Sequence, residues 1–185
     1  ENRPDSNYYG IQELHNTWTN IAYILVALIL CMRQTPKLYQ IEDSRRRMIS
    51  MVLFGFYCWA ILMTGITSWW FHATLLFVAQ KSDEFFENCA ILSVFYMSRK
   101  PLCLASIYWT VVHCGILFVG VFTVQNLFCE VHLVVMVLCG LFNLRMRIAE
   151  LTHGSAVKNE IEQHAMVCAG SFAIGGSAWL LDMFA

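Results

Sequence analysis

The stretch MVLFGFYCWAILMTGI, residues 51–66, determines the fold class, because 16 consecutive positions carry no charged side chain. A helix that crosses a bilayer needs about 20 mainly apolar residues, and this stretch is the centre of one that runs over residues 47–71. A second apolar core, IAYILVALILCM at residues 21–32, precedes it. Two such segments in close succession favour a protein whose helices cross a membrane.

Working outward from these segments, we expect six membrane helices. They cover residues 11–32, 47–71, 82–98, 102–124, 127–144 and 163–185. The connections are short, with a polar segment at residues 34–46 and a tight turn at residues 77–81. The predicted fold class is therefore all-α, a polytopic transmembrane helix bundle that forms a single domain over residues 1–185.

The composition excludes several other classes of protein. Hydrophobic residues make up 58% of the chain and charged residues 14%, and the net charge is −1. An ordinary soluble domain has about 45–50% apolar and about 25% charged residues. This balance excludes a disordered chain, a basic nucleic-acid binder and an ordinary soluble enzyme. A soluble helical bundle is the competing interpretation, but it needs polar helix faces that residues 102–144 almost lack.

The basic residues predict an orientation. Ten of the 12 lie in the connections after the first, third and fifth expected helices, and the other two are Arg3 and Lys81. The positive-inside rule places those three connections in the cytosol and the N-terminus in the lumen. The eight cysteines lie mostly in apolar runs and form no C-x-x-C pair, so we expect buried free thiols rather than disulfides.

The candidate functional residues lie where the second expected helix meets the third. Ser68 and His72 are four residues apart and share one helix face. Asp83 follows 11 residues later, and a turn between the helices would bring it close to them. A carboxylate within a membrane costs about 2.5–3.5 kcal/mol, so such residues are candidates for function. Histidine binding a metal, aspartate acting as a base and serine stabilising an oxyanion would suit a metal-dependent hydrolase.

A structural role for the same residues stays open at this point. His72 could form a hydrogen bond between helices. Asp83 and Glu84 could instead favour the start of the third helix, since carboxylates stabilise the positive end of a helix.

The motif GITSWWFHATLLFVAQKSDE, residues 65–84, resembles the G-x-G-S-x-x-F-H-x-T-L…Q-x-x-D-E signature of alkaline ceramidases. These belong to the wider CREST group of seven-helix membrane hydrolases. IQELHNTWTNIAYI at residues 11–24 and Trp179 with Asp182 are similar to two further family motifs. The chain departs from the pattern at Thr67, where the family has glycine. The family also continues D-E-x-P-M, whereas this chain reads DEFFE at residues 83–87.

The resemblance implies a zinc-dependent amidase that cleaves ceramide to a sphingoid base and a free fatty acid. His72 matches a zinc ligand, Ser68 the active-site serine and Asp83 the active-site aspartate. Zinc would lower the pKa of its bound water, and Asp83 would accept the proton.

The resemblance also implies a stimulatory Ca²⁺ site. Glu13 matches the family glutamate of the first helix, and Glu1, Asp5 and Asn7 offer oxygen ligands upstream. Solvated residues ahead of a helix are the alternative interpretation of the same segment.

The other two zinc ligands of the family form an H-x-x-x-H on a seventh helix. No two of the six histidines here are four residues apart, and His113 and His132 are expected to be packed or hydrogen-bonded within helices. The chain starts without methionine and ends on an apolar segment. We therefore expect a fragment with six of seven helices that is inactive alone.

The expected partners are ceramide and membrane lipid, with no nucleic acid and no obligate protein partner. The expected location is the endoplasmic reticulum or Golgi membrane. Two alternatives stay open, namely a receptor-like member of the same group that binds lipid without cleaving it, and a hydrolase of another lipid amide.

Overall fold

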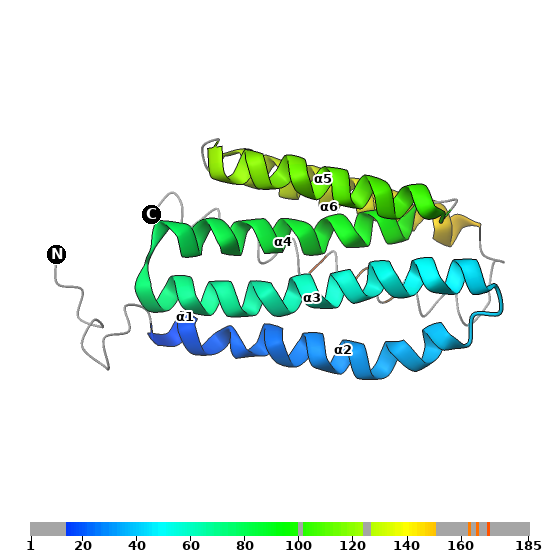
Figure 1. The fold of residues 1–185 in the computed structure, drawn as a ribbon, viewed down its shortest axis with the longest axis horizontal. Helices are drawn as coiled ribbons and strands as arrows, with labels where there is room; N and C mark the ends of the chain where they lie inside the picture. Colours follow the sequence, from blue (N-terminus) through cyan, green and yellow to red (C-terminus); the bar gives the residue numbers. More distant parts are fainter. Residues whose placement is uncertain are drawn as a thin grey trace. The chain divides into compact units, whose positions relative to one another are not determined.

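The computed structural model of the protein describes residues 14–99, 102–123 and 127–150, together with positions 163, 166 and 170. The regular elements of this part are six α-helices, which confirms the all-α prediction (Figure 1). They are α1 (Leu14–Thr19), α2 (Ile21–Tyr39), α3 (Ser44–Thr74), α4 (Phe77–Ser98), α5 (Leu104–Thr123) and α6 (Leu127–Ala149). The chain divides into two compact units, residues 1–136 and 137–185, and the packing below concerns the first. A single domain over the whole chain stays a prediction.

Four helical segments are long and apolar enough to cross a membrane, which supports a polytopic membrane protein. They are Asn16–Tyr39, Ser44–Thr74, Leu104–Thr123 and Phe128–Ala149. They correspond to four of the six expected helices. The stretch at residues 163–185 lies outside the continuously described part of the chain.

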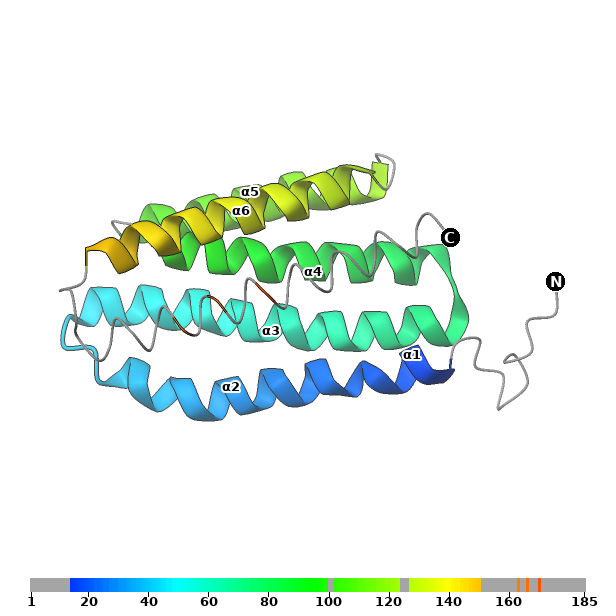
Figure 2. The same cartoon turned by 180° about the vertical axis from the view of Figure 1, so that it is seen from behind.

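Helix α4 is too polar to meet the same criterion, because its first half carries Lys81, Asp83, Glu84 and Glu87. It nevertheless lies between α3 and α5 in both views of the fold (Figures 1 and 2). Charged side chains in a membrane protein are tolerated where they face other helices rather than lipid. The neighbours of α4 therefore explain how this helix carries four charges, three of which lie in the expected third helix.

The predicted polar connection at residues 34–46 is wrong over its first part. Helix α2 continues through Pro36 to Tyr39, and Lys37 lies in its last turn, where a positive charge suits the helix end. Helix α3 then begins at Ser44 because the Asp43 carboxylate caps it. That carboxylate accepts hydrogen bonds from the backbone N–H groups of Arg45 (2.9 Å) and Arg46 (3.2 Å).

The connection between α3 and α4 also differs from the prediction. The turn is formed by Leu75 and Leu76 rather than by residues 77–81, and α4 already begins at Phe77. Leu75 has a left-handed backbone with φ of 53°, and its N–H donates to the carbonyl of Phe71 at 2.6 Å. A two-residue connection makes α3 and α4 an antiparallel hairpin.

Two glycines allow helices to approach closely. A Cβ added at Gly65 of α3 would lie 2.9 Å from Ile24 Cγ1 and 3.0 Å from Tyr23 Cβ, both on α2. A Cβ added at Gly120 of α5 would lie only 2.2 Å from the ring of Phe128 on α6. Small residues at these points let the helix backbones come together, as is common between membrane helices.

The cysteines in the described residues are free, as expected. Cys58, Cys89 and Cys129 are buried, and the Cys89 and Cys114 sulfur atoms lie 3.8 Å apart between α4 and α5. Cys139 is exposed, so the expectation of burial is wrong for that thiol.

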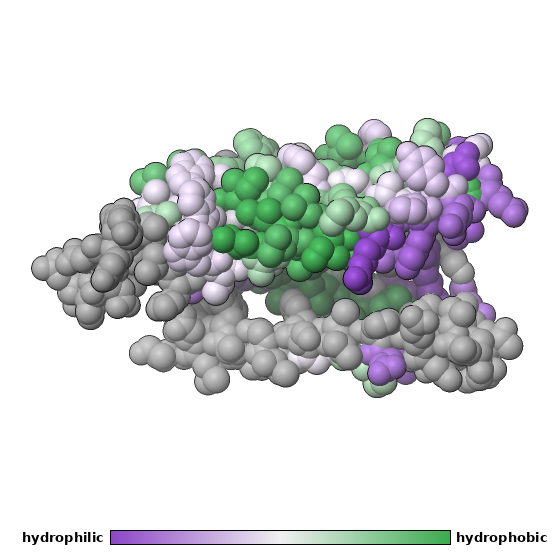
Figure 3. All heavy atoms as spheres, turned by 90° about the horizontal axis from the view of Figure 1, so that it is seen from below, coloured by the Kyte–Doolittle hydropathy of each residue, from purple (hydrophilic) through white to green (hydrophobic). Residues whose placement is uncertain are grey.

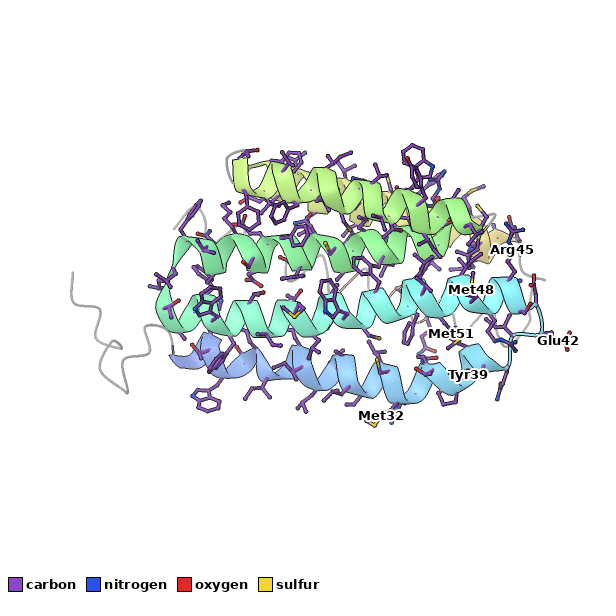
Figure 4. The ribbon with its side chains drawn as sticks, viewed as in Figure 1. Met32, Tyr39, Glu42, Arg45, Met48 and Met51 are labelled. Carbon is purple, nitrogen blue, oxygen red and sulfur yellow. The ribbon has the colours of Figure 1, made fainter. Side chains whose placement is uncertain are left out.

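The surface shows the pattern expected of a membrane protein. A broad hydrophobic area adjoins hydrophilic residues at one end of the view (Figure 3). Exposed Glu42 lies in the connection between α2 and α3, exposed Arg45 in the first turn of α3 and exposed Tyr39 at the end of α2 (Figure 4). Large apolar side chains such as Met32, which is 69% exposed, cover the outer surface of α2.

Candidate active site

The antiparallel hairpin brings Ser68 and Asp83 together. Ser68 lies six residues before the end of α3 and Asp83 six residues after the start of α4, so the two stand at the same level. The Ser68 hydroxyl is within hydrogen-bonding reach of the Asp83 carboxylate. Ser68 is buried and Asp83 is half-buried. The predicted approach of these two side chains across a turn is found, whereas their catalytic role stays a prediction.

His72 lies in the last turn of α3, four residues after Ser68 and on the same helix face. It is half-buried, and its ring centroid is 5.0 Å from that of Phe71. His72 is thus at the same end of the hairpin as Ser68 and Asp83.

The structural explanation for the two acidic residues is wrong. It required Asp83 and Glu84 to start the helix, but α4 starts at Phe77 and its first turn contains no acidic residue. The favourable effect of a helix N-terminus is confined to that first turn. Helix initiation therefore does not account for Asp83.

Two further residues interact with Asp83, and neither was predicted from the sequence. Glu87 lies one turn further along α4, close enough for the two carboxylates to repel each other. Tyr23 of α2 interacts electrostatically with both carboxylates. The four-residue spacing of Asp83 and Glu87 was a usable signal for Glu87. Tyr23 had no such signal, because its position depends on the packing of α2 against Gly65.

The opposite face of α4 carries a buried ion pair. Lys81 is 1% exposed, and its Nζ lies 2.7 Å from Oε2 of Glu84. The ammonium also lies 5.6 Å from the ring centroid of Phe77, and the Cys129 thiol of α6 contacts the Glu84 carboxylate. The prediction that Lys81 belongs to a turn is wrong, and this pair was not foreseen from the sequence.

A hydrogen-bonded chain of three side chains joins α4 to the next two helices. Nδ1 of His132 on α6 lies 2.7 Å from Oδ1 of Asn88 on α4. Nε2 of the same ring lies 3.1 Å from Nε2 of His113 on α5. The expectation that His113 and His132 are hydrogen-bonded is confirmed.

One buried donor near the hairpin lacks a partner. Asn20 stands between α1 and α2 and is 6% exposed, and its Nδ2 makes no hydrogen bond within the described part of the chain. Its carbonyl lies against Gly65, one helical turn from Ser68. A buried unsatisfied donor costs about 1–3 kcal/mol.

The described residues do not form a complete zinc site. A catalytic zinc has three protein ligands and one open position. No group of three metal-binding side chains occurs among residues 14–99, 102–123 and 127–150. Within these ranges, His72 supplies one suitable ligand at the site. The four candidate calcium ligands, Glu1, Asp5, Asn7 and Glu13, lie outside the described residues.

Comparison with known proteins gives one match. The profile of a protein family described as Ceramidase matches residues 6–185, which includes every described helix. No curated protein and no solved structure matches the chain.

Proposed function

Because this chain belongs to the ceramidase family, we propose that it hydrolyses the amide bond of ceramide with Ser68 and Asp83 as the reacting side chains. Family membership indicates ceramide as the substrate and a hydrolase as the general class of enzyme. The observation that supports the two residues is their approach across the α3–α4 hairpin. A carboxylate and a hydroxyl held together below a membrane surface suit general base catalysis with oxyanion stabilisation.

The proposed reaction uses one water molecule. The Asp83 carboxylate takes a proton from the water as its oxygen bonds to the carbonyl carbon of the amide. The Ser68 hydroxyl donates a hydrogen bond to the carbonyl oxygen as negative charge develops there. The C–N bond then breaks, and Asp83 returns the proton to the leaving nitrogen. The products are a free fatty acid and a sphingoid base.

We further propose that two metal ions support this reaction. His72 would supply one zinc ligand, and a bound zinc would make water a stronger nucleophile. Glu13, with Glu1, Asp5 and Asn7, would hold Ca²⁺ through oxygen atoms. The support is the sequence resemblance and the suitability of these side chains as ligands.

Purified protein in detergent micelles that contain ceramide tests the central proposal. We expect release of a sphingoid base by the full-length protein that contains this chain, and loss of release in its Ser68→Ala variant. Ser93→Ala is a matched control, because Ser93 is fully buried and its hydroxyl donates within α4 to the Cys89 carbonyl. Wild-type protein that binds ceramide without cleaving it would contradict the proposal and favour a receptor-like function. Cleavage of another lipid amide in preference to ceramide would show that the other amide is the substrate.

Metal content tests the second part. His72→Ala is expected to lose bound zinc, and Glu13→Ala to lose stimulation by calcium. Activity that persists after stringent removal of zinc would contradict the zinc proposal, and unchanged activity of Glu13→Ala at low calcium would contradict the calcium proposal.

We also propose that the N-terminus faces the lumen of the endoplasmic reticulum or Golgi. The support is the placement of ten of the 12 basic residues in alternate connections. Protease accessibility of an N-terminal tag in sealed microsomes tests this orientation, and cleavage from the cytosolic side would contradict it.

A further inference from the structure

We propose that the chain of hydrogen bonds from His113 through His132 to Asn88 positions α4, and thereby holds Asp83 against Ser68. This inference rests on the proposed function for its kinetic consequence, since Asp83 is the proposed base. The three side chains meet on the side of α4 that faces α5 and α6, whereas Ser68 belongs to α3. They are therefore positioning residues.

The hydrogen bonds have one consistent direction. The Asn88 Nδ2 group donates to the carbonyl of Glu84 at 2.8 Å, which leaves Oδ1 of the same amide as an acceptor. Nδ1 of His132 must then carry the hydrogen that Oδ1 accepts at 2.7 Å. In the neutral ring Nε2 is consequently an acceptor, and Nε2–H of His113 donates to it at 3.1 Å. The five amide and ring atoms that link these side chains thus each have a defined role as donor or acceptor.

The series of hydrogen bonds ends at the Glu84 carbonyl, in the helical turn that carries the proposed base. The Glu84 carbonyl belongs to the residue directly after Asp83. Residues 83 and 88 are five apart, so their side chains leave the helix about 140° from one another. Asn88 therefore holds α4 from the side of α5 and α6, while Asp83 points toward Ser68 on α3.

The side chains around these hydrogen bonds leave little room for water to replace a lost partner. Asn88 is 2% exposed. The His132 ring stacks on Phe128 with centroids 6.2 Å apart, and the His113 ring meets Tyr96 edge-on at 6.3 Å. Lipid offers no replacement for a lost hydrogen bond inside a helix bundle. Removal of one partner would leave the others unsatisfied and allow α4 to rotate.

Two readouts test the positioning role. The first is the steady-state kinetics of ceramide hydrolysis, and the second is the rate at which the double variant Ser68→Cys/Asp83→Cys cross-links under copper–phenanthroline, followed by mass spectrometry. We expect His132→Phe to lower kcat by about tenfold with KM unchanged, because misplacement of a reacting group costs rate rather than binding. The same substitution should slow the cross-link. Asn88→Leu should have the same effects, and the combination of both should add little.

Matched variants separate positioning from general damage to the bundle. Ser93→Ala removes a fully buried hydrogen bond that stays within α4, so both readouts should be unchanged. If His132→Phe fails to fold, His113→Phe removes only the outer donor and should lower kcat by about threefold.

The outcomes distinguish this inference from the proposed function. Wild-type kcat and an unchanged cross-linking rate in His132→Phe or His113→Phe would overturn the inference. If the full-length protein does not cleave ceramide but His132→Phe still slows the cross-link, the proposed function fails and the positioning role stands.

Discussion

Both faces of α4 carry polar side chains, but on one face they have complementary partners and on the other two carboxylates lie close together. Toward α5 and α6, Lys81 pairs with Glu84, and Asn88 bonds to a histidine. Toward α2 and α3, the Asp83 carboxylate meets the Ser68 hydroxyl and a second carboxylate, Glu87. Polar groups inside a bundle are stable when they are paired, whereas the half-buried Asp83 carboxylate lies beside the like charge of Glu87, which is exposed. The difference supports the proposal that one face holds the helix in place and the other carries the reacting groups.

The largest expected effect tests the chemical face. Asp83→Asn should lower the rate of ceramide hydrolysis by about 10²–10⁴-fold, because the amide cannot accept a proton. The fold should be unchanged, since the substitution removes repulsion with Glu87. Release of sphingoid base measures the rate, and size-exclusion chromatography in detergent checks folding. Glu87→Gln is the matched control with a smaller effect, and equal losses in the two variants would remove the distinction between Asp83 and its neighbour.

The next effect tests the opposite face. Lys81→Met should lower the free energy of unfolding by about 3 kcal/mol, because the partly buried Glu84 carboxylate loses its cation and keeps only the Cys129 thiol as a partner. The double variant Lys81→Met/Glu84→Leu should recover most of the stability. Unfolding in mixed micelles measures both. If the double variant is as unstable as the single one, the ion pair is not the reason for burying Lys81.

A smaller effect is expected where α5 meets α6. Gly120→Ala should cost about 1–3 kcal/mol, because its Cβ would overlap the Phe128 ring that stacks on His132. Gly115→Ala on the same helix is the control, because its Cβ meets nothing within 4 Å. The difference in thermal unfolding between the two variants is the measurement. Equal stability would show that α5 and α6 tolerate a wider separation.

The smallest effect concerns the packing behind the chemical face. Gly65→Ala should cost about 1 kcal/mol, because its Cβ would press on Ile24 and Tyr23 at about 3 Å. Movement of Tyr23 away from Asp83 should also reduce hydrolysis modestly. Gly55→Ala, whose Cβ meets nothing within 4 Å, serves as the control in the same unfolding and activity assays. Full activity in Gly65→Ala would exclude a contribution of Tyr23 to the site.

Sequence spacing predicted the candidate site better than it predicted the helix ends. Ser68 and Asp83 were expected to meet, because a turn had to lie between two apolar stretches. The position of that turn was wrong by a few residues. Leu75 and Leu76 are apolar and give no turn signal, whereas Gln80 and Lys81 are polar and suggested one. Pairing with Glu84 allows the Lys81 side chain to lie inside the bundle, so its polarity did not mark a turn.

The cap at Asp43 was not predicted from the sequence. Local sequence was sufficient for the long apolar helices and for the motif that contains Ser68, His72 and Asp83. These depend on apolar length and on residues that are neighbours along the chain. The contacts of Tyr23 and the direction of the bonds through His132 arose from helix packing. Lys81 and Glu84 are three residues apart on one helix, so their pairing was a local signal that the sequence analysis missed. Contacts that arise from packing join residues far apart in the sequence, such as Tyr23 with Asp83 and, 44 positions apart, Asn88 with His132. They depend on how closely glycines let the helices approach. Periodicity along one helix carries no information about that distance.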